Sequence, residues 1–460
     1  MVTNVNSVIV GCGEVGFALA GMLSTAGHHV TVVDNDQRVL DRVADKLDVQ
    51  ALRGDATSPA TVRMLNLENC FMMCSVTDID EVNMISSMMG HKLGVQHTVA
   101  RIRNPEYFRE DSPLNRETFG IDLVVSPEVV AAQGVAKLLR FPGALEVDYF
   151  FDNQVKMVEH VLPAECDLTL KPLKDVNVPK SVLILAAFRE GEVLVPRGND
   201  RLRIGDRIVA LMRPEKSEDF RRLIGIKKRQ MQRVMLLGGG RITVILSRLL
   251  LKQGIKVCII ESDEQKCDLL ASEIDDALVL CGDGTDRHLL MEEHVGQVDA
   301  FISLTDNDEL NVMSAMLAKT LGAGKVITQV AKPEYSMLVP SLGVDKVFSP
   351  LRMTARAIMS YLYGGSAPLS SILEGDLARM LQFRVGSEAP GIGKPLKELR
   401  LPEGSVVGVI QSQDKVLVAD GESVVEPGDS LLVFALHDAA AAALRLFGVK
   451  KHFLGAGLEF

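Results

Sequence analysis

The sequence lacks the features of a membrane-spanning or secreted chain. No uncharged apolar run reaches the roughly 18 residues of a transmembrane helix, and the N-terminal MVTNVNSVIVGCG has no basic segment followed by a long apolar core. The formal net charge is −10 at pH 7. This charge disfavours a general nucleic-acid or anionic-membrane binder, because phosphate surfaces attract basic faces. We therefore expect a cytosolic protein that binds no nucleic acid but is free to bind a membrane protein.

The sequence also lacks common catalytic and metal-binding motifs. The nine histidines are scattered, and there is no H-E-x-x-H, no G-x-S-x-G and no Walker lysine motif. None of the seven cysteines forms a C-x-x-C pair. Cys70 and Cys74 lie in an apolar run, as do Cys12, Cys258 and Cys281. This placement is typical of small buried thiols in a reducing compartment. We expect no metal site and no catalytic residue.

The second half of the chain repeats the first, in the same order and with similar spacing. The matched segments are VIVGCGEVG (8–16) with VMLLGGGRIT (234–243), VTVVDNDQ (30–37) with VCIIESDEQ (257–265), GDAT (54–57) with GDGT (282–285), SVTDIDEVN (75–83) with SLTDNDELN (303–311), ARIRNPEY (100–107) with QVAKPEY (329–335), and GIDLVVSP (120–127) with GVDKVFSP (343–350). Two further matching segments begin with KPLK, at Lys171 and Lys394. The chain therefore reads A–B–A′–B′, and we predict four domains, at 1–142, 143–228, 229–366 and 367–460.

Unit A alternates short, nearly continuous apolar runs with helical stretches, a pattern typical of a parallel sheet covered on both faces. The expected strands are 8–10, 30–33, 49–52, 70–76, 97–102 and 121–125, and the expected helices are 15–26, 37–47 and 81–93. The fold class is therefore α/β, with two Rossmann-like doubly wound parallel sheets. Each sheet is followed by a small β-rich α+β module, in which the expected strands of unit B are 181–187, 192–195 and 207–211.

A nucleotide site is predicted at the start of unit A. The run Gly11-Cys12-Gly13-Glu14-Val15-Gly16 is a G-x-G-x-x-G between a strand and a helix, where free backbone N–H groups face an anion. Asp34, about 20 residues on, ends the next strand and is placed to accept hydrogen bonds from ribose hydroxyls. A carboxylate there favours NAD or an adenine ribonucleotide over NADP. The alternative role of Asp34 is a cap on the following helix.

Further candidates follow the later strands of unit A. Asp55 and Thr57 lie where an adenine edge would be, and Thr77 lies beside the phosphates. Arg101 ends the fifth strand and has the geometry to bind a phosphate with two hydrogen bonds, and Arg103 is a second candidate. The alternatives are turn residues that satisfy their own backbone and surface salt bridges.

Unit A′ predicts a second, altered site. Its matching residues are Gly238, Gly239, Gly240, Arg241, Ile242, Glu261, Asp283 and Thr305. Thr243 replaces the third glycine, and Gln329 stands where unit A has Arg101. One phosphate charge partner is therefore lost, with Arg241 as a candidate to compensate.

These motifs, with the A–B–A′–B′ order, the two T-D-x-D-E-x-N segments and ARIRNPEY, closely resemble the TrkA family, the regulatory subunits of Trk potassium-uptake systems. In that family the two domain types are called RCK-N (or KTN) and RCK-C, and the resemblance covers essentially the whole chain. It implies a non-enzymatic, homotetrameric protein that binds NAD(H) and ATP or ADP in its RCK-N domains. It also implies a peripheral location on the cytoplasmic face of the cell membrane, where the protein gates a potassium-translocating subunit of the TrkH/TrkG type.

Two other functional classes remain open from the residues alone. An NAD-dependent oxidoreductase would need a substrate domain with an acid or base aimed at the nicotinamide, and the B units offer only short β modules. A nucleotide-sensing scaffold for another transporter is the second alternative.

Overall fold

The first parallel sheet has the strand order β3-β2-β1-β4-β5-β6 of a Rossmann domain. The computed structural model describes residues 5–25, 27–108, 112–141, 143–151, 153–163, 166–226, 231–363, 369–373, 377–413 and 415–449. The strands are β1 Asn6–Val10, β2 His29–Asp34, β3 Gln50–Arg53, β4 Cys70–Ser75, β5 His97–Arg101 and β6 Leu123–Val125. The helices are α1 Glu14–Thr25, α2 Gln37–Lys46, α3 Pro59–Arg63, α4 Asp80–Lys92 and α5 Pro127–Leu139. The predicted strands and crossover helices are therefore confirmed.

The second parallel sheet repeats this order as β14-β13-β12-β15-β16-β17. Its strands are β12 Arg233–Leu237, β13 Lys256–Glu261, β14 Leu278–Cys281, β15 Ala300–Ser303, β16 Lys325–Gln329 and β17 Lys346–Phe348. Its helices are α8 Arg241–Leu251, α9 Glu264–Glu273, α10 Arg287–Glu292, α11 Asp308–Thr320, α12 Pro333–Leu338 and α13 Pro350–Tyr363. Both sheets thus place the ends of their strands and the starts of α1 and α8 at one edge.

Each small module is an antiparallel sheet, with orders β10-β9-β11-β8-β7 and β18-β19-β22-β20-β21. The strands are β7 Ala144–Phe150, β8 Val155–Val161, β9 Val182–Arg189, β10 Glu192–Leu194, β11 Arg207–Met212, β18 Leu369–Leu373, β19 Ala378–Arg384, β20 Ser405–Ser412, β21 Lys415–Val418 and β22 Ser430–Leu436. The helices are α6 Asp167–Leu170, α7 Ser217–Leu223 and α14 His437–Leu446. Short 3₁₀ turns are η1 Leu67–Asn69, η2 Pro105–Phe108, η3 Leu173–Asp175, η4 Pro214–Lys216, η5 Val295–Gln297, η6 Val339–Leu342 and η8 Leu396–Glu398. Strands β9 to β11 were predicted, whereas β7 and β8 were not.

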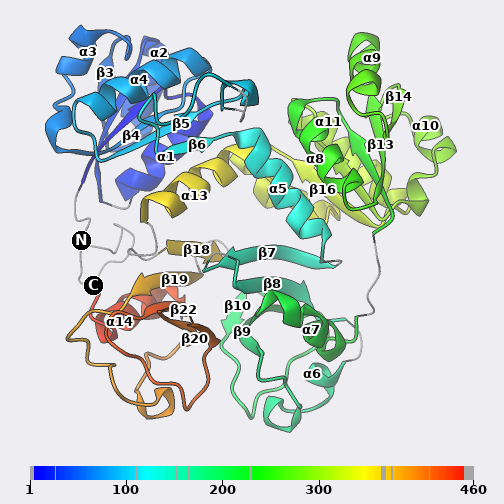
Figure 1. Cartoon of the computed structure of the whole chain (residues 1–460). Coiled ribbons are helices and arrows are strands. Elements are labelled where there is room, and N and C mark those ends of the chain that lie inside the picture. Colours follow the sequence, from blue (N-terminus) through cyan, green and yellow to red (C-terminus); the bar gives the residue numbers. More distant parts are fainter. Residues whose placement is uncertain are drawn as a thin grey trace.

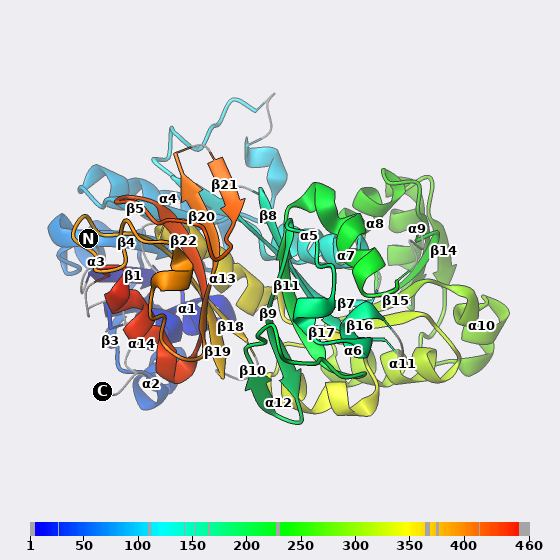
Figure 2. The same cartoon turned by 90° about the horizontal axis from the view of Figure 1, so that it is seen from below.

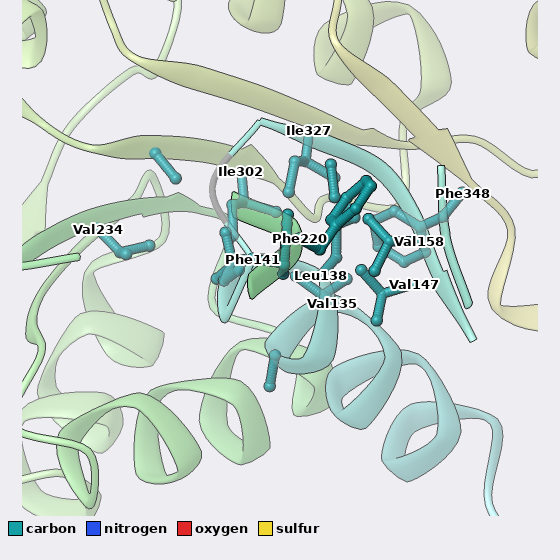
Figure 3. Packing of buried hydrophobic residues seen from close by; sticks show 14 of the residues in the cluster. Val135, Leu138, Phe141, Val147, Val158, Phe220, Val234, Ile302, Ile327 and Phe348 are labelled. Carbon is teal, nitrogen blue, oxygen red and sulfur yellow. The ribbon is translucent and has the colours of Figure 1, made fainter. Parts of the chain in front are cut away.

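The last helix of each Rossmann unit packs on the other unit. Helix α5 lies along α8, α13 lies along α1, and the two helices cross each other between the units (Figure 1). Ala355 and Ile358 of α13 are fully buried in the core of the first unit. Val135 and Leu138 of α5 belong to a cluster that continues into the second sheet through residues such as Ile302 (Figure 3). Each half of the chain therefore completes the core of the other.

The two small modules also pack against each other, below the Rossmann units in Figure 1. Met157, Leu185 and Leu211 of the first module share a buried cluster with Met380 and Phe434 of the second. Figure 2 shows the two antiparallel sheets side by side from below. This face-to-face contact gives the pair of modules a common core.

The predicted domain boundaries, after residues 142, 228 and 366, fall outside the described residues and stay predictions. Ala26, the last residue of one predicted helix, also lies outside them. In the part of the chain that the structure describes, no helix is long and apolar enough to cross a membrane.

Candidate functional site

The glycine-rich turn of the first unit is shaped by close backbone approaches. Gly11 has a φ of +84°, and a side chain there would meet Thr77 at 2.7 Å. A methyl group at Gly16 would overlap the carbonyl oxygen of Gly11. At Gly13, by contrast, an added Cβ would meet nothing within 4 Å. The turn therefore requires glycine at two positions for its own geometry, and it leaves open space at the middle one, where a ligand would approach.

Three other predicted residues of this turn contribute in different ways. Cys12 and Val15 are buried, so only their backbone groups face the strand ends. Burial, followed by the nearby carboxylate of Asp34, raises the pKa of Cys12 to about 12, so the thiol stays protonated. Glu14 is exposed and forms an ion pair of 3.0 Å with Arg42 of α2. The contribution of the turn to an anion site is therefore made by its backbone N–H groups.

Asp34 links the turn to the end of β2. Its Oδ2 accepts a hydrogen bond from the backbone N–H of Cys12 at 2.7 Å, and its Oδ1 accepts one from the N–H of Asp36 at 2.9 Å. The cap of α2 is Asp36, whose side chain accepts from the N–H of Arg38. The role of Asp34 as the helix cap is therefore wrong. Each carboxylate oxygen keeps lone-pair capacity for a further donor, as a ribose hydroxyl would require.

The loops after β4 and β5 are held by two polar residues of α4, the partly buried Asp80 and the fully buried Asn83, that the sequence analysis had not singled out. Asn83 is fully buried and accepts hydrogen bonds from the N–H and the hydroxyl of Thr77 at 2.8 and 2.7 Å. Its amide donates to the carbonyl oxygens of Thr77 and Arg101 at 3.0 and 2.8 Å. The carboxylate of Asp80 accepts from the N–H groups of Arg103 and Asn104 at 2.8 to 3.0 Å. We call Asp80 and Asn83 the staple of the first site.

The same staple occurs in the second unit. Asn311 accepts from the N–H and hydroxyl of Thr305 at 2.9 and 2.7 Å and donates to the carbonyl oxygen of Gln329 at 3.2 Å. Asp308 accepts from the N–H groups of Ala331 and Lys332, both at 2.9 Å. The recurring T-D-x-D-E-x-N segments are thus explained in large part by their acid and amide, which fix the backbone at the strand ends. The recurrence was the sequence signal for these residues.

Two arginines meet one carboxylate beside the first site. Arg101 is only 8% exposed, and its Nη1 donates to Asp78 at 3.0 Å. Arg103 forms an ion pair with the same carboxylate. Within the described residues, the Nε atoms of both arginines are buried without a hydrogen-bond partner. Burial, and then Arg103, lower the pKa of Arg101. Both cations pair with the largely exposed Asp78, and Glu128 is a second carboxylate near Arg101. The two unpartnered Nε atoms leave donor capacity for a further anion.

Asp55 and Thr57 form a local turn at the end of β3. The backbone N–H and the hydroxyl of Thr57 donate to Asp55 Oδ1 at 2.8 and 2.7 Å. Asp283 and Thr285 repeat the arrangement at the same distances after β14. These residues therefore form turns that satisfy their own backbone. Their exposed carboxylates lie at the edge where an adenine was predicted.

The second site keeps the carboxylate and changes its surroundings. Glu261 accepts from the N–H groups of Gly239, Ser262 and Asp263 at 2.6, 2.7 and 2.9 Å. Burial opposes ionisation of Glu261, but these backbone hydrogen bonds outweigh it and lower its pKa. Gly238 has a φ of +98° and lies against Thr305. Glu261 is thus held as an anion with more of its lone pairs already engaged than those of Asp34.

The substituted positions of the second site have clear structural roles. Thr243 is fully buried and its hydroxyl donates to the carbonyl oxygen of Gly238 at 2.6 Å. This is the carbonyl position that Gly16 leaves free in the first unit. The Oε1 of Gln329 is buried without a partner among the described residues. Arg241, which begins α8 beside Gly240 and Ile242, donates to the carbonyl oxygen of Arg103 at 3.2 Å. The second glycine turn therefore contacts a loop of the first site.

One expectation about the cysteines is wrong. Cys12, Cys70 and Cys74 are buried as predicted, but Cys281 is exposed and Cys258 is partly exposed. Cys281 ends the edge strand β14, so its apolar neighbours along the sequence do not cover it. No cluster of three or more metal-ligating side chains occurs in the parts of the chain the structure describes.

The fold and the two sites define a tandem of Rossmann-type domains with the architecture of dinucleotide-binding proteins. The TrkA-N domain model matches residues 7–127 and 234–350, and the TrkA-C domain model matches 157–225 and 380–448. The chain therefore belongs to the TrkA family.

Relatives and solved structures agree with this assignment. The Trk system potassium uptake protein TrkA homolog 1 of Methanosarcina mazei is 32% identical over 96% of this chain and 99% of its own. A TrkA homolog of Archaeoglobus fulgidus is 34% identical over 94% and 97%. The GsuK channel bound to NAD has a TM-score of 0.62 at 15% identity, covering 97% of this chain and 80% of its own. The GsuK structure bound to ADP has a TM-score of 0.50 at 12% identity, covering 79% and 70%. At these identities the two structures establish the fold alone.

Proposed function

We propose that the chain is a nucleotide-sensing regulatory subunit of a membrane potassium-uptake system. The observation that carries the proposal is the first site, in which Asp34 accepts a hydrogen bond from the glycine turn and the space next to Gly13 is open. The family membership connects this site to potassium uptake, because the relatives are named for that process. The names describe transport proteins, in line with a sensor that carries out no catalysis.

The proposed ligands are NAD(H) and ATP or ADP. The start of α1 offers backbone N–H groups to a pyrophosphate, and Asp34 offers acceptors to a ribose. These parts are common to all four molecules. The names of the GsuK structures, which mention NAD and ADP, support this ligand class for a chain with the same fold. We propose that the first site is the stronger one, because Gln329 replaces Arg101 in the second and Glu261 already accepts three backbone hydrogen bonds.

Arg101 and Arg103 are proposed to distinguish ATP from ADP. Both pair with Asp78, which is mostly exposed. A terminal phosphate that replaces this carboxylate would therefore bind both arginines, and neither cation would be left without an anionic partner. Charge-assisted hydrogen bonds of this type contribute about 1.5–3 kcal/mol each. Arg101→Ala is therefore expected to weaken ATP more than ADP. Equal losses for both nucleotides would assign the arginine a structural role.

The proposed output is a change in the shape of the assembly that docks on the membrane subunit. We propose a homotetramer at the cytoplasmic face of the membrane, bound to a potassium-translocating subunit of the TrkH/TrkG type. A ligand shifts such an assembly only if it binds two shapes with different affinity. A typical coupling free energy of about 1–3 kcal/mol would change transport about 5–150-fold. Helices α5 and α13 join the units and are the elements through which such a change would pass.

The proposal is tested by calorimetric titration of the full chain with ATP, ADP, NAD and NADH. Asp34→Ala removes the acceptor of the first site, Glu261→Ala that of the second, and Asp45→Ala on the exposed face of α2 serves as the matched control. We expect saturable binding, in which Asp34→Ala abolishes the part at the first site, Glu261→Ala the weaker part at the second, and Asp45→Ala leaves both intact. Absence of binding by all four nucleotides would overturn the sensor proposal. Binding followed by unchanged potassium uptake in cells carrying Asp34→Ala would overturn the regulatory part.

A further inference from the structure

Two cysteines meet beside the carboxylate of the second site. Cys281 is the last residue of β14 and lies in register with Glu261 of the neighbouring parallel strand β13. Cys267 lies on α9, which packs on β14, and its Sγ contacts the backbone carbonyl oxygen of Glu261 at 3.4 Å. Cys281 is also among the neighbours that raise the pKa of Cys267, as expected for two side chains that lie close together. Both thiols therefore lie at one place, where α9, β13 and β14 meet.

The two thiols differ in access. Cys281 is exposed, whereas Cys267 is 7% exposed. Burial, followed by the neighbouring Cys281, raises the pKa of Cys267 to about 12. A reagent in solution thus reaches Cys281 first, and Cys267 remains a protonated thiol next to it. An accessible cysteine with a second cysteine in contact is the arrangement of redox-sensing thiol pairs.

The pair occurs in the second unit only. Helices α2 and α9 begin 227 residues apart and strands β3 and β14 begin 228 residues apart, so the equivalents of Cys267 and Cys281 are Leu40 and Arg53. Leu40 is buried in the first unit. The first site therefore provides a control within the same chain, with the same fold and no thiols at these two positions.

We propose that Cys267 and Cys281 form a reversible intramolecular disulfide, a modification site that responds to low-molecular-weight disulfides. The Cys281 thiolate attacks one sulfur of the small disulfide, forms a mixed disulfide and releases one small thiolate. Cys267 then loses its proton to solvent and attacks the Cys281 sulfur, which releases the second small thiolate. Two protein thiols are oxidised and one small disulfide is reduced to two thiols. Transient disulfides of this kind are the type expected in a reducing compartment.

The bond would tie α9 to the edge strand next to Glu261. Leu270, one turn along α9 from Cys267, already lies against the glycine turn, where a Cβ at Gly239 would meet it at 2.6 Å. The residue after Cys281 begins the turn with Asp283, the predicted adenine edge. We therefore expect a nucleotide in the second site and the disulfide to influence each other. This last expectation rests on the proposed function, whereas the disulfide itself does not.

The test uses the full, reduced chain and glutathione disulfide. Free thiols are counted under denaturing conditions, and the linked peptides are identified by mass spectrometry. The chain has seven cysteines, and we expect the count to fall from seven to five, with a Cys267–Cys281 peptide that disappears after reduction. Cys258→Ser removes a partly exposed thiol of the neighbouring strand and is the matched control, with an expected fall from six to four. Cys267→Ser should keep glutathione on Cys281.

Two outcomes would overturn the proposal. One is a wild-type chain that retains seven thiols, and the other is a wild-type chain that stops at the mixed disulfide on Cys281. The link to the ligand is measured separately, on Asp34→Ala protein with and without NADH. We expect bound NADH to slow disulfide formation about fivefold or more, the lower end of typical coupling between sites. Equal rates, with calorimetry showing the second site filled, would contradict the placement beside the ligand. If NADH does not bind there, the thiol count still decides the disulfide.

Discussion

Ile358→Ala tests whether helix α13 belongs to the core of the first Rossmann unit. Ile358 belongs to the second unit in sequence, but it is fully buried among residues of the first, such as Ile9 and Leu19. Removing a buried isoleucine side chain to alanine costs about 2–5 kcal/mol, because transfer energy is lost and a cavity is left. We take about 3 kcal/mol for this site. The first unit, not the second, should lose this stability.

Hydrogen exchange followed by mass spectrometry resolves the two units. A loss of about 3 kcal/mol raises the population of the opened first unit roughly a hundredfold. Peptides covering β1, β2 and β4 should exchange faster by up to this factor, whereas those covering β12, β13 and β15 should stay close to wild type. The matched control is Leu246→Ala in α8, a fully buried residue of the second unit, for which the faster exchange should lie in the second sheet.

The result that would refute the reasoning is equally specific. If Ile358→Ala left exchange in β1, β2 and β4 unchanged and increased it in the second sheet, α13 would pack on its own unit. The crossed arrangement of α5 and α13 would then be wrong, together with the route proposed between the sites.

Three other variants test the sites and one partly buried lysine. Asn83→Ala removes four hydrogen bonds, which should destabilise the fold by about 3 kcal/mol. It should therefore lower the melting temperature and weaken nucleotide binding at the first site, whereas Asn311→Ala should spare binding at that site. Unchanged binding in Asn83→Ala would contradict the role of the staple. Gly16→Ala places a methyl group on the carbonyl oxygen of Gly11 and should abolish binding at the first site in titrations while the chain still folds by circular dichroism. Burial lowers the pKa of Lys325 to about 7. Between this pH and the pKa of the lysine in the unfolded chain, the unfolded state binds one more proton than the folded state, so the free energy of unfolding rises with pH. Lys325→Met should flatten this rise in urea titrations at several pH values, and an unchanged slope would contradict the assignment to Lys325.

The sequence was sufficient for the parallel sheets because their strands are continuously apolar and separated by helical stretches. The same regularity placed the glycine turn and Asp34 at the ends of β1 and β2, where the structure has them bonded to each other. Strands β7 and β8 were missed since both mix charged residues with apolar ones, as in KMVEH of β8. That pattern makes sense only in the structure, where β8 is buried between β7 and β11.

The partners of buried residues were beyond sequence reasoning. The apolar residues of α5 and α13 mark them as core helices, but nothing in their pattern tells which sheet they cover. The hydrogen bonds of Asn83 join positions up to 18 residues apart, and only the folded chain shows that they are one unit. The contact of Cys267 with Cys281 likewise depends on how α9 lies on β14. Patterns along the chain identify elements, whereas specific contacts between them are set by packing.

The crossed helices bear on how such a chain could arise and be divided. A protein with only one Rossmann unit and one small module would lack the helix that completes its core, and a second copy would have to supply it. Such an ancestor would be an obligate dimer with exchanged helices, and duplication within one gene would join its two subunits. Joining them frees the two halves from symmetry, so that Thr243, Gln329 and the thiols of α9 and β14 can change on one side only. Two half-chains separated within residues 227–230, produced together, should accordingly reassemble, while either one alone should not fold.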